Sequence, residues 1–324
     1  MMNIIKCLKT SAVFIGTLIG AGFATGREIL LFFGKSSPVV PIISCIICGG
    51  FSILFLVAGK KGLNVVPTKG GKLIIGAFYV AAFIVFAAMI SASDEIINSL
   101  LGIYGGGVVL AIIIAIICLS SKDGLKILNI LVVPFIIILV IIISSRISMP
   151  VVPIKFNIGN AFAYAALNMF LGGFLIVPDG RTMNNKEILT TGFITVALLT
   201  FTLLMIYKIV LNSNNALMPV MEVAGILNMQ IIASIIILLA IITTMAGCFT
   251  ALAAITTTVI KSKLISGILV LIKGILMAIV GFKLIVDIGY PLVSIVGIIY
   301  TIGVIAAVIK GNNNNKVILL KSKW

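Results

Sequence analysis

The sequence predicts an all-α membrane protein that crosses the bilayer ten times, as two halves of five helices each. Hydrophobic residues make up 61% of the 324 residues and charged residues only 10%, whereas soluble domains are about 45–50% apolar and about 25% charged. The apolar residues are gathered in runs that suit bilayer-spanning helices, each of which takes about 20 residues. The first and the sixth of these runs, which open the two halves, are both interrupted by glycines.

Clusters of Lys, Gly, Pro and Asn separate the apolar runs and set their limits. The predicted spans are residues 10–33, 38–58, 72–98, 105–121, 125–144, 157–178, 188–211, 229–259, 264–281 and 285–309. We expect one transmembrane domain over residues 1–324. Its first repeat covers about 10–144, its second covers about 157–309, and residues 310–324 form a polar tail.

The basic residues predict the orientation of the spans. With a cytoplasmic N-terminus, 16 of the 23 Lys and Arg residues lie in cytoplasmic connections, 5 lie outside, and Arg27 and Lys273 lie within spans. Cytoplasmic loops carry an excess of basic residues in membrane proteins. We therefore expect both termini in the cytoplasm, with ten spans in the cytoplasmic membrane rather than nine or eleven.

Composition also excludes several classes of function. The chain has no histidine, which removes His-based catalysis and most transition-metal sites. The net charge of +15 comes from basic residues in short gaps between apolar runs, a pattern that does not indicate a nucleic-acid partner. No nucleophile–base pair is evident, so we expect no enzyme activity. Cys45 and Cys48 lie within one apolar run, which favours buried thiols over a redox or zinc site.

The first span combines three glycines with a charge pair, in the segment 19–28, which reads IGAGFATGRE. A glycine costs roughly 1 kcal/mol in a helix interior, and an ionised side chain at the bilayer centre costs at least about 2.5 kcal/mol. The sixth span contains a central Asn168 followed by Gly172 and Gly173. Glycine-interrupted segments in corresponding positions indicate an inverted-repeat transporter such as those of the LeuT fold, with helices 1 and 6 broken at the midplane. Two alternatives remain open: unbroken helices packed closely through glycine, and, for the N-terminal run, a secretory signal peptide.

Broken helices expose backbone groups that must find partners inside the membrane. Free N–H groups can hold an anionic group, and free carbonyls can hold a cation. We predict that a small polar solute lies between residues 20–26 and 164–173, with Asn168 as a side-chain contact. The predicted solute-binding residues are Gly20, Gly22, Phe23, Ala24, Gly26, Tyr164, Asn168 and Phe170.

Charged residues within the spans are candidates for gating or proton transfer. Arg27 and Glu28 are expected to face the protein interior, each with a polar partner, since an unpaired charge in the membrane is costly. Arg27 could recruit a solute carboxylate or close an outer gate, and Glu28 or Asp94 could carry a proton. Asp94 could equally be interfacial, because it lies near the outer end of the third span.

The segment Gly20–Ile29, which reads GAGFATGREI, resembles the signature GAGFASGQEI of the YkvI-like bacterial membrane proteins. Further matches are Tyr164 with Asn168, Thr243 with Thr244, and Tyr290 with Pro291, so the resemblance extends over essentially the whole chain. The chain departs from that signature at Arg27, where Gln is common. The family in turn resembles the LeuT-fold transporters of the amino acid–polyamine–organocation superfamily.

This resemblance implies a sodium site between the broken first helix and the eighth. Carried over position by position, its ligands are the carbonyls of Gly20, Phe23 and Ala240 and the hydroxyls of Thr243 and Thr244. The resemblance also implies that the outer connection containing Glu222 forms a lid. A different interpretation of the threonines is that each bonds a carbonyl of its own helix.

The predicted function is secondary active transport of an amino acid or a related small polar solute, coupled to sodium, with no organic cofactor and with membrane lipid as the surrounding partner. Proton coupling is the alternative within transport. A non-transporting solute sensor, like the permease-like subunits of germinant receptors, is another class of function, and a structural or channel-like membrane protein is a third.

Overall fold

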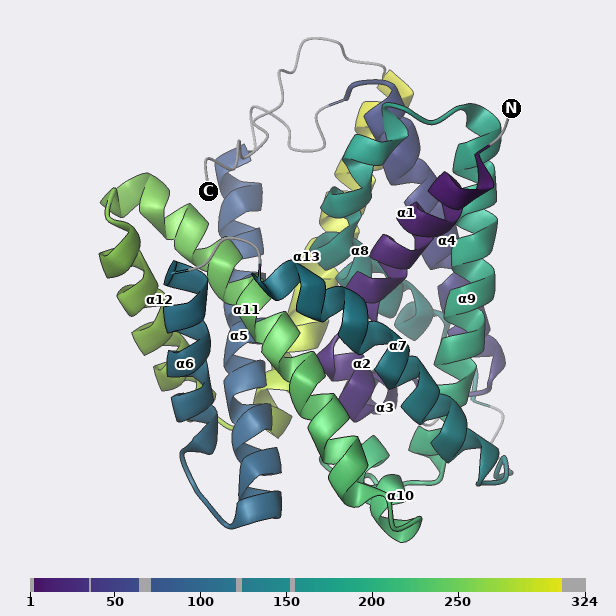
Figure 1. Cartoon of the computed structure of the whole chain (residues 1–324). Helices are drawn as coiled ribbons and strands as arrows, with labels where there is room; N and C mark the ends of the chain where they lie inside the picture. The colour runs from purple at the N-terminus through teal and green to yellow at the C-terminus, as the bar shows by residue number, and fades with distance from the viewer. Residues whose placement is uncertain (1–2, 35, 64–70, 121–123, 152–154, 311–324) are drawn as a thin grey trace.

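The computed structural model describes residues 3–34, 36–63, 71–120, 124–151 and 155–310. Helices account for nearly all of these residues (Figure 1). The helices are α1 (Ile4–Leu18), α2 (Ala21–Thr25), α3 (Arg27–Phe33), α4 (Val39–Lys60), α5 (Gly71–Leu101), α6 (Gly106–Ser120), α7 (Gly124–Ser145), α8 (Ile158–Gly180), α9 (Asn185–Leu211), α10 (Pro219–Ile226), α11 (Gln230–Ile260), α12 (Lys263–Ala278) and α13 (Phe282–Lys310).

Each predicted span coincides with a helix or, for the first span, with the series α1–α3. Within the described ranges, five helices are long and apolar enough to cross a membrane, namely α4, α5, α9, α11 and α13, and α6 and part of α7 are shorter apolar helices. The all-helical membrane class is therefore confirmed, and the count of ten spans stays a prediction.

Hydrogen bonds between connections show which helix ends lie together. At the end of the bundle where α1 begins, the Lys6 Nζ donates to the Thr182 carbonyl over 2.5 Å, and the Lys61 Nζ donates to the Val308 carbonyl over 3.0 Å. At the opposite end, the Asn212 Nδ2 donates to the Ser148 carbonyl over 3.0 Å. The start of α1 and the ends of α4, α8 and α13 thus share one side, as the predicted alternation of spans requires.

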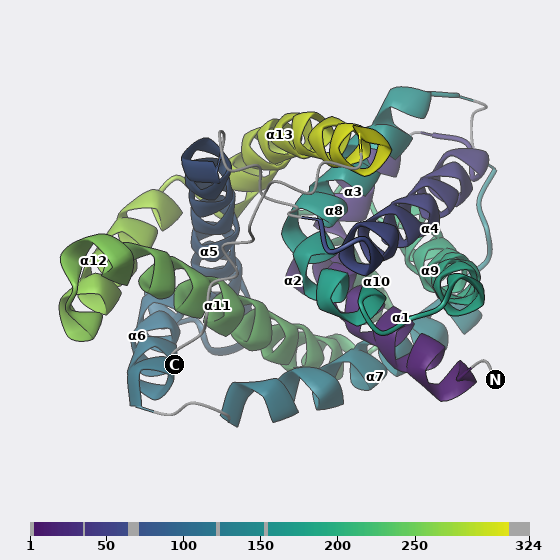
Figure 2. The same cartoon turned by 90° about the horizontal axis from the view of Figure 1, so that it is seen from above.

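The helices divide into two groups that lie side by side (Figure 2). One group contains α1, α4, α8 and α9, and the other contains α5, α6, α11 and α12. Two further helices contact both groups: α13 packs on α8 and α5, and α7 packs on α11 and α9. Each group takes two helices from each half of the chain, an arrangement that suits the predicted repeat.

The first span is interrupted as the glycines predict. Helix α1 ends at Leu18, and its last backbone bond runs from the Ile19 N–H to the Ile15 carbonyl. Gly20 is extended, and α2 begins at Ala21. Gly26 then adopts a left-handed conformation with φ of 78°, which glycine reaches without the steric cost that a side chain would add. The chain thereby changes direction before α3.

The sixth span is not broken, and this part of the prediction was wrong. Helix α8 runs without interruption from Ile158 to Gly180. Its glycine pair serves close packing instead: a Cβ on Gly172 would lie 2.5 Å from the Thr17 Oγ1 of α1, and a Cβ on Gly173 would lie 2.8 Å from the Phe55 ring of α4. Small residues let membrane helices approach one another in this way.

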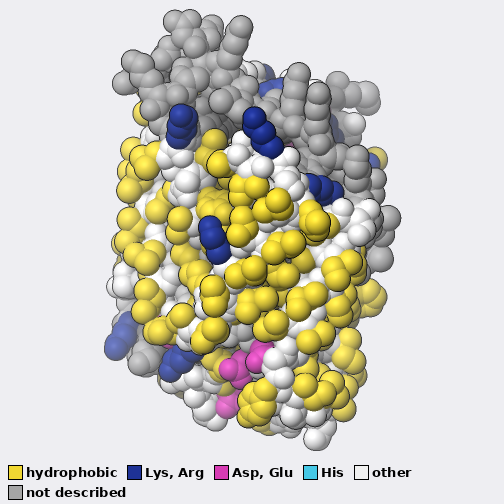
Figure 3. Space-filling view, turned by 90° about the vertical axis from the view of Figure 1, so that its left-hand side faces the viewer, with side chains coloured by type: hydrophobic (Ala, Val, Ile, Leu, Met, Phe, Trp, Pro, Cys, Tyr) yellow, Lys and Arg dark blue, Asp and Glu magenta, His cyan; other side chains and the backbone are white. Residues whose placement is uncertain are grey.

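The surface of the bundle is largely apolar. Isoleucine, leucine and valine side chains are exposed along α6, α11, α12 and α13. Figure 3 shows one such face, on which apolar side chains form a broad band and acidic side chains gather toward the lower end. A surface of this composition fits lipid as its solvent, and the chain is a multi-pass membrane protein.

Helix α10 was not predicted as a separate element. It lies in the long connection between α9 and α11 and packs against α2. A Cβ on Gly26 would lie 3.1–3.2 Å from side-chain atoms of Val210, Pro219 and Val220. The start of α10 therefore covers the turn between α2 and α3.

Candidate solute and cation site

The interrupted first span lies between the two groups of helices, where α2 contacts α11 and α3 contacts α8, α9 and α13. All residues from Ala21 to Ile29 are buried, and Gly20 is half-buried. The second predicted segment, residues 164–173, contacts the first span at α1 and α3: Gly172 lies against Thr17, and the Asn168 Nδ2 donates a hydrogen bond to Glu28.

Arg27 forms an ion pair with Asp287 of α13, 260 residues further along the chain. Its Nη2 lies 2.5 Å from the Oδ2 and 2.6 Å from the Oδ1 of Asp287, and its Nε lies 3.2 Å from the same Oδ1. Its Nη1 donates to the Ala216 carbonyl over 3.4 Å. The predicted interior position and polar partner of Arg27 are therefore both found in the structure.

Glu28 is buried at 6% exposure and has a much weaker partner. The Asn168 Nδ2 donates to its Oε1 over 3.3 Å and to the Tyr164 carbonyl over 2.9 Å. Its Oε2 lies over Gly22, where an added Cβ would be only 2.7 Å away. The same Cβ would lie 3.3 Å from the Tyr290 hydroxyl, so Gly22, Glu28 and Tyr290 converge on one point.

Tyr164 completes this buried cluster from α8. Its ring centroid lies 5.0 Å from that of Phe33 and 5.8 Å from that of Phe32. Its hydroxyl is buried and has no hydrogen-bond partner among the described residues, and most buried polar groups do have one. Tyr164, Asn168, Glu28 and Tyr290 thus form a polar centre within an apolar surrounding.

Two of the predicted site residues, Phe170 and Asp94, make contacts outside this polar centre. The Phe170 ring packs on Phe78 of α5 and Tyr300 of α13, with centroids 6.0 Å and 5.5 Å away. The Asp94 Oδ1 accepts a hydrogen bond of 3.0 Å from the Gly107 N–H, in the first turn of α6, and this makes it a helix cap. A further role of Asp94 as a gate or proton carrier stays a prediction.

The predicted sodium ligands come from α2 and α11, which are in contact. The Thr244 Oγ1 lies 3.4 Å from the Ala21 N–H, directly at the break in the first span. Thr243 and Thr244 donate to the Ala240 carbonyl over 2.9 Å and 3.0 Å, the self-bonding expected of membrane threonines. The carbonyls of Gly20 and Phe23 accept from the N–H groups of Ala24 and Gly26.

This donor set fits a hard monovalent cation in its chemistry. All five predicted ligands are uncharged oxygens, and a carbonyl oxygen that already accepts one hydrogen bond retains a second lone pair. Among the described residues, no group of three or more Cys, Asp, Glu or His side chains could hold a metal ion. The Thr243 and Thr244 hydroxyls also retain lone pairs while they donate to the Ala240 carbonyl.

The side of the site that faces away from the start of α1 is covered by the connection between α9 and α11. Besides the Ala216 carbonyl that receives Arg27, this segment contains Glu222, whose carboxylate accepts from the N–H and the Nδ2 of Asn214 over 3.0 Å and 3.3 Å. These contacts hold α10 over Gly26, which is the position expected of a lid.

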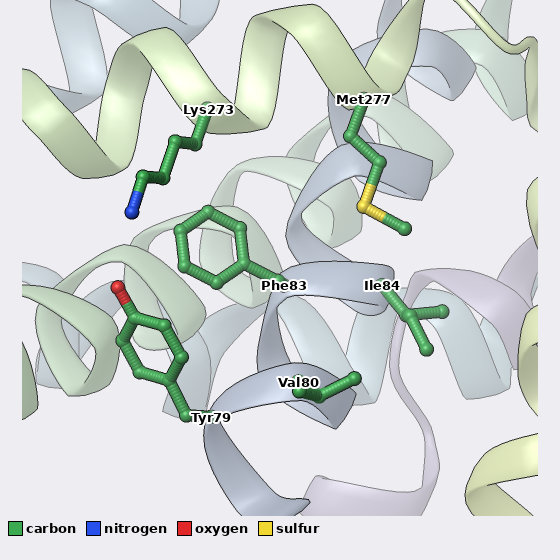
Figure 4. A pocket seen from close by; sticks show the side chains of 6 residues that line it. All are labelled: Tyr79, Val80, Phe83, Ile84, Lys273 and Met277. Carbon is green, nitrogen blue, oxygen red and sulfur yellow. The ribbon is translucent and has the colours of Figure 1, made fainter. Parts of the chain in front are cut away.

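A separate groove of about 260 Å³ lies between α5 and α12 (Figure 4). It is lined by Lys273 and Met277 from α12 and by Tyr79, Val80, Phe83 and Ile84 from α5. None of the predicted solute or sodium residues lines it.

Sequence reasoning missed two residues of the centre. Neither Asp287 nor Tyr290 was predicted as a site residue, although Tyr290 is one of the positions that carry the resemblance. The signal available for Asp287 was its charge: it is an isolated acid in an apolar span, as Arg27 is an isolated base in another, and membrane charges tend to pair with one another.

The helix arrangement, the interrupted first span and the polar centre define a multi-pass membrane protein with the fold of a transporter rather than of an enzyme. The chain is distantly homologous to the uncharacterized membrane protein YkvI of Bacillus subtilis (strain 168), with 27% identity over 206 residues, which cover 56% of this chain and 59% of YkvI. The matched region thus spans about three fifths of the length of that relative. No family model matches the chain.

Among solved structures, the fold is similar to that of Mhp1, a nucleobase-cation-symport-1 family transporter. The inward-facing conformation of Mhp1 matches with a TM-score of 0.66 and 13% identity, over 90% of this chain and 73% of Mhp1. The closed conformation with bromovinylhydantoin bound matches with a TM-score of 0.61, over 90% of this chain and 76% of that one. The LeuT-like fold is thereby confirmed.

Proposed function

We propose that the protein is a sodium-coupled symporter of an amino acid or a related small polar solute. The observation that supports this most strongly is the contact between Thr244 of α11 and the break in the first span, at the Ala21 N–H. It lies within a fold shared with a cation symporter. In this proposal, both termini are cytoplasmic, and residues 10–144 and 157–309 are the two repeats.

The proposed sodium site joins two elements from different groups of helices. A cation held by Gly20, Phe23, Ala240, Thr243 and Thr244 would bind most tightly when α2 and α11 are close. A ligand shifts a conformational equilibrium only through its different affinity for the two states. Sodium bound here would therefore favour the arrangement in which α2 lies on α11, and this would couple its binding to that of the solute.

The ion pair of Arg27 and Asp287 is proposed as the outer gate. It connects α3 to α13 and, through the Ala216 carbonyl, to the segment that covers the site. Opening the outer side requires these contacts to break. In this arrangement, Arg27 holds the site closed instead of binding a solute carboxylate.

The test is solute uptake into liposomes that contain the purified full-length protein, under imposed gradients of sodium or protons. We expect a sodium gradient to drive uptake of at least one small amino acid or amine. The double substitution Thr243→Val and Thr244→Val keeps the side-chain shape and removes two oxygens. We expect it to abolish both sodium-driven uptake and thermal stabilisation by sodium while the protein still folds, and the single substitution Thr258→Val, at a threonine further along α11, serves as the control.

A specific observation favours proton coupling as the second candidate, since Glu28 is buried with one amide as its hydrogen-bond partner among the described residues. Uptake driven by protons alone, with unchanged sodium response in the double variant, would replace sodium coupling by proton coupling. Solute binding without uptake under either gradient would favour a sensor.

A further inference from the structure

We propose that the transported solute carries a positively charged amino group, which binds the Glu28 carboxylate beside Tyr290, Tyr164 and Asn168. This inference rests on the proposed transport function and narrows its substrate class to small amines with net positive charge. It is supported by the charges of the central site and by its buried polar atoms.

The central site contains an acid, Glu28, that has no basic partner among the described residues. Arg27 uses its Nε and Nη2 on Asp287 and its Nη1 on the Ala216 carbonyl, so this pair is neutral as a unit. No basic side chain among the described residues forms an ion pair with Glu28. The Asn168 amide, 3.3 Å away, is a neutral donor and does not compensate a charge. The Glu28 carboxyl group is therefore left without a basic partner in the part of the chain that the structure describes.

The groups that face Glu28 are those that recognise an ammonium ion. Tyr290 of α13 lies beside the same glycine, with its ring Cε2 3.4 Å and its hydroxyl 3.3 Å from a Cβ built on Gly22. The Tyr290 hydroxyl can accept a hydrogen bond from an ammonium N–H. The buried Tyr164 hydroxyl, without a partner among the described residues, can accept a hydrogen bond from an ammonium N–H.

The remaining neighbours of Glu28 add no charge. Cys48 of α4 is close enough to Glu28 to interact with it electrostatically, but a buried thiol carries no charge. On α2, Gly22 has no side chain, and its missing Cβ would lie 2.7 Å from the Glu28 Oε2. The lack of a side chain at Gly22 thus lets the Glu28 carboxylate lie directly against the backbone of α2.

The same arrangement disfavours acids and zwitterions. A solute carboxylate would need a free cation, and Arg27 is already engaged at all three of its nitrogen positions. A net positive amine, in contrast, neutralises Glu28 and brings no second charge to bury. Since an uncompensated charge in the membrane interior is strongly unfavourable, the site should select for amines over amino acids.

The experiment measures ligand-induced thermal stabilisation of the purified full-length protein in detergent. The probes are ethylamine, butylamine and hexylamine, with butanoic acid, butan-1-ol and norvaline as matched acid, neutral and zwitterionic compounds. We expect at least one amine to stabilise the protein, and to do so at lower concentration than its matched compounds. Glu28→Gln keeps the side-chain size, and we expect it to weaken amine binding about tenfold or more, as for a lost charge-assisted hydrogen bond. Glu95→Gln, at an exposed acid of α5, should leave binding unchanged.

The pH dependence gives a second measurement that needs no variant. A proton competes with the amine for Glu28, so amine affinity of the wild-type protein should fall as the pH is lowered. The Glu28→Gln protein should lose this dependence. Stabilisation by the acid or by norvaline but by none of the amines, full amine affinity in Glu28→Gln, or a pH-independent affinity would each overturn the inference.

The two proposals fail in different ways. If sodium drives uptake of norvaline and no amine binds, the transport function holds and the amine specificity is wrong. If amines bind through Glu28 and no solute is taken up under any gradient, the amine site holds and the transport function is wrong.

Discussion

The ion pair between Arg27 and Asp287 makes a quantitative prediction, because its two ends differ in burial. The Arg27 side chain is 8% exposed and that of Asp287 is 29% exposed. Replacing Asp287 with Asn leaves a buried guanidinium with one neutral acceptor in place of a carboxylate. Replacing Arg27 with Gln leaves a carboxylate that is less completely buried. The two single substitutions should therefore differ in cost.

Breaking a buried ion pair by removing one partner costs about 3–5 kcal/mol, and partial exposure lowers this figure. We expect Asp287→Asn to cost about 3 kcal/mol, near the lower end of that range, and Arg27→Gln about 1–2 kcal/mol. The double variant contains no unpaired charge, so it should be more stable than the sum of the single losses predicts. The coupling energy should be about 2 kcal/mol, within the range measured for close charge pairs.

The assay is thermal unfolding in detergent followed with a thiol-reactive fluorophore. Cys7, Cys45 and Cys48 are buried free thiols, so they react only when the protein opens. All four proteins of the cycle are compared under the same conditions. Losses that simply add in the double variant, or a greater loss for Arg27→Gln than for Asp287→Asn, would refute the reasoning from burial.

The remaining predictions concern helix packing, the site and the topology. A Cβ on Gly59 would lie 1.9 Å from the Val177 carbonyl oxygen, whereas nothing lies within 4 Å of a Cβ built on Gly50 of the same helix. Gly59→Ala should therefore destabilise the protein by about 1–3 kcal/mol, and Gly50→Ala should not. Thermal unfolding of the two variants measures this difference. Gly22→Ala should reduce solute affinity without loss of folded protein, because its Cβ would press on Glu28, and unchanged affinity would place the solute elsewhere. In a chain without its native cysteines, Lys283→Cys should react with an impermeant reagent in intact cells and Lys61→Cys should react only after permeabilisation; the reverse result would invert the predicted orientation.

The sequence determined the class of the protein because membrane helices depend on local properties. Hydropathy and length mark the spans, since each backbone group in lipid must be satisfied within its own helix. The break at Gly20 was predictable for a related reason. Three glycines and two charged residues within residues 20–28 disfavour a continuous helix regardless of what surrounds it. Arg27 and Glu28 were expected inside the protein on the same grounds.

Only the tertiary structure decided how the polar residues are paired and which glycines break a helix. Gly172 and Gly173 lie in a continuous α8, and the groups they make room for, Thr17 and Phe55, come from other helices. A glycine that frees the backbone and one that admits a neighbour look alike in sequence, because the difference lies in what packs against it. The partner of Arg27 was hidden for the same reason. Asp287 is 260 residues away, and only the packing of α13 against α3 brings the two charges together and leaves Glu28 without a counter-charge among the described residues.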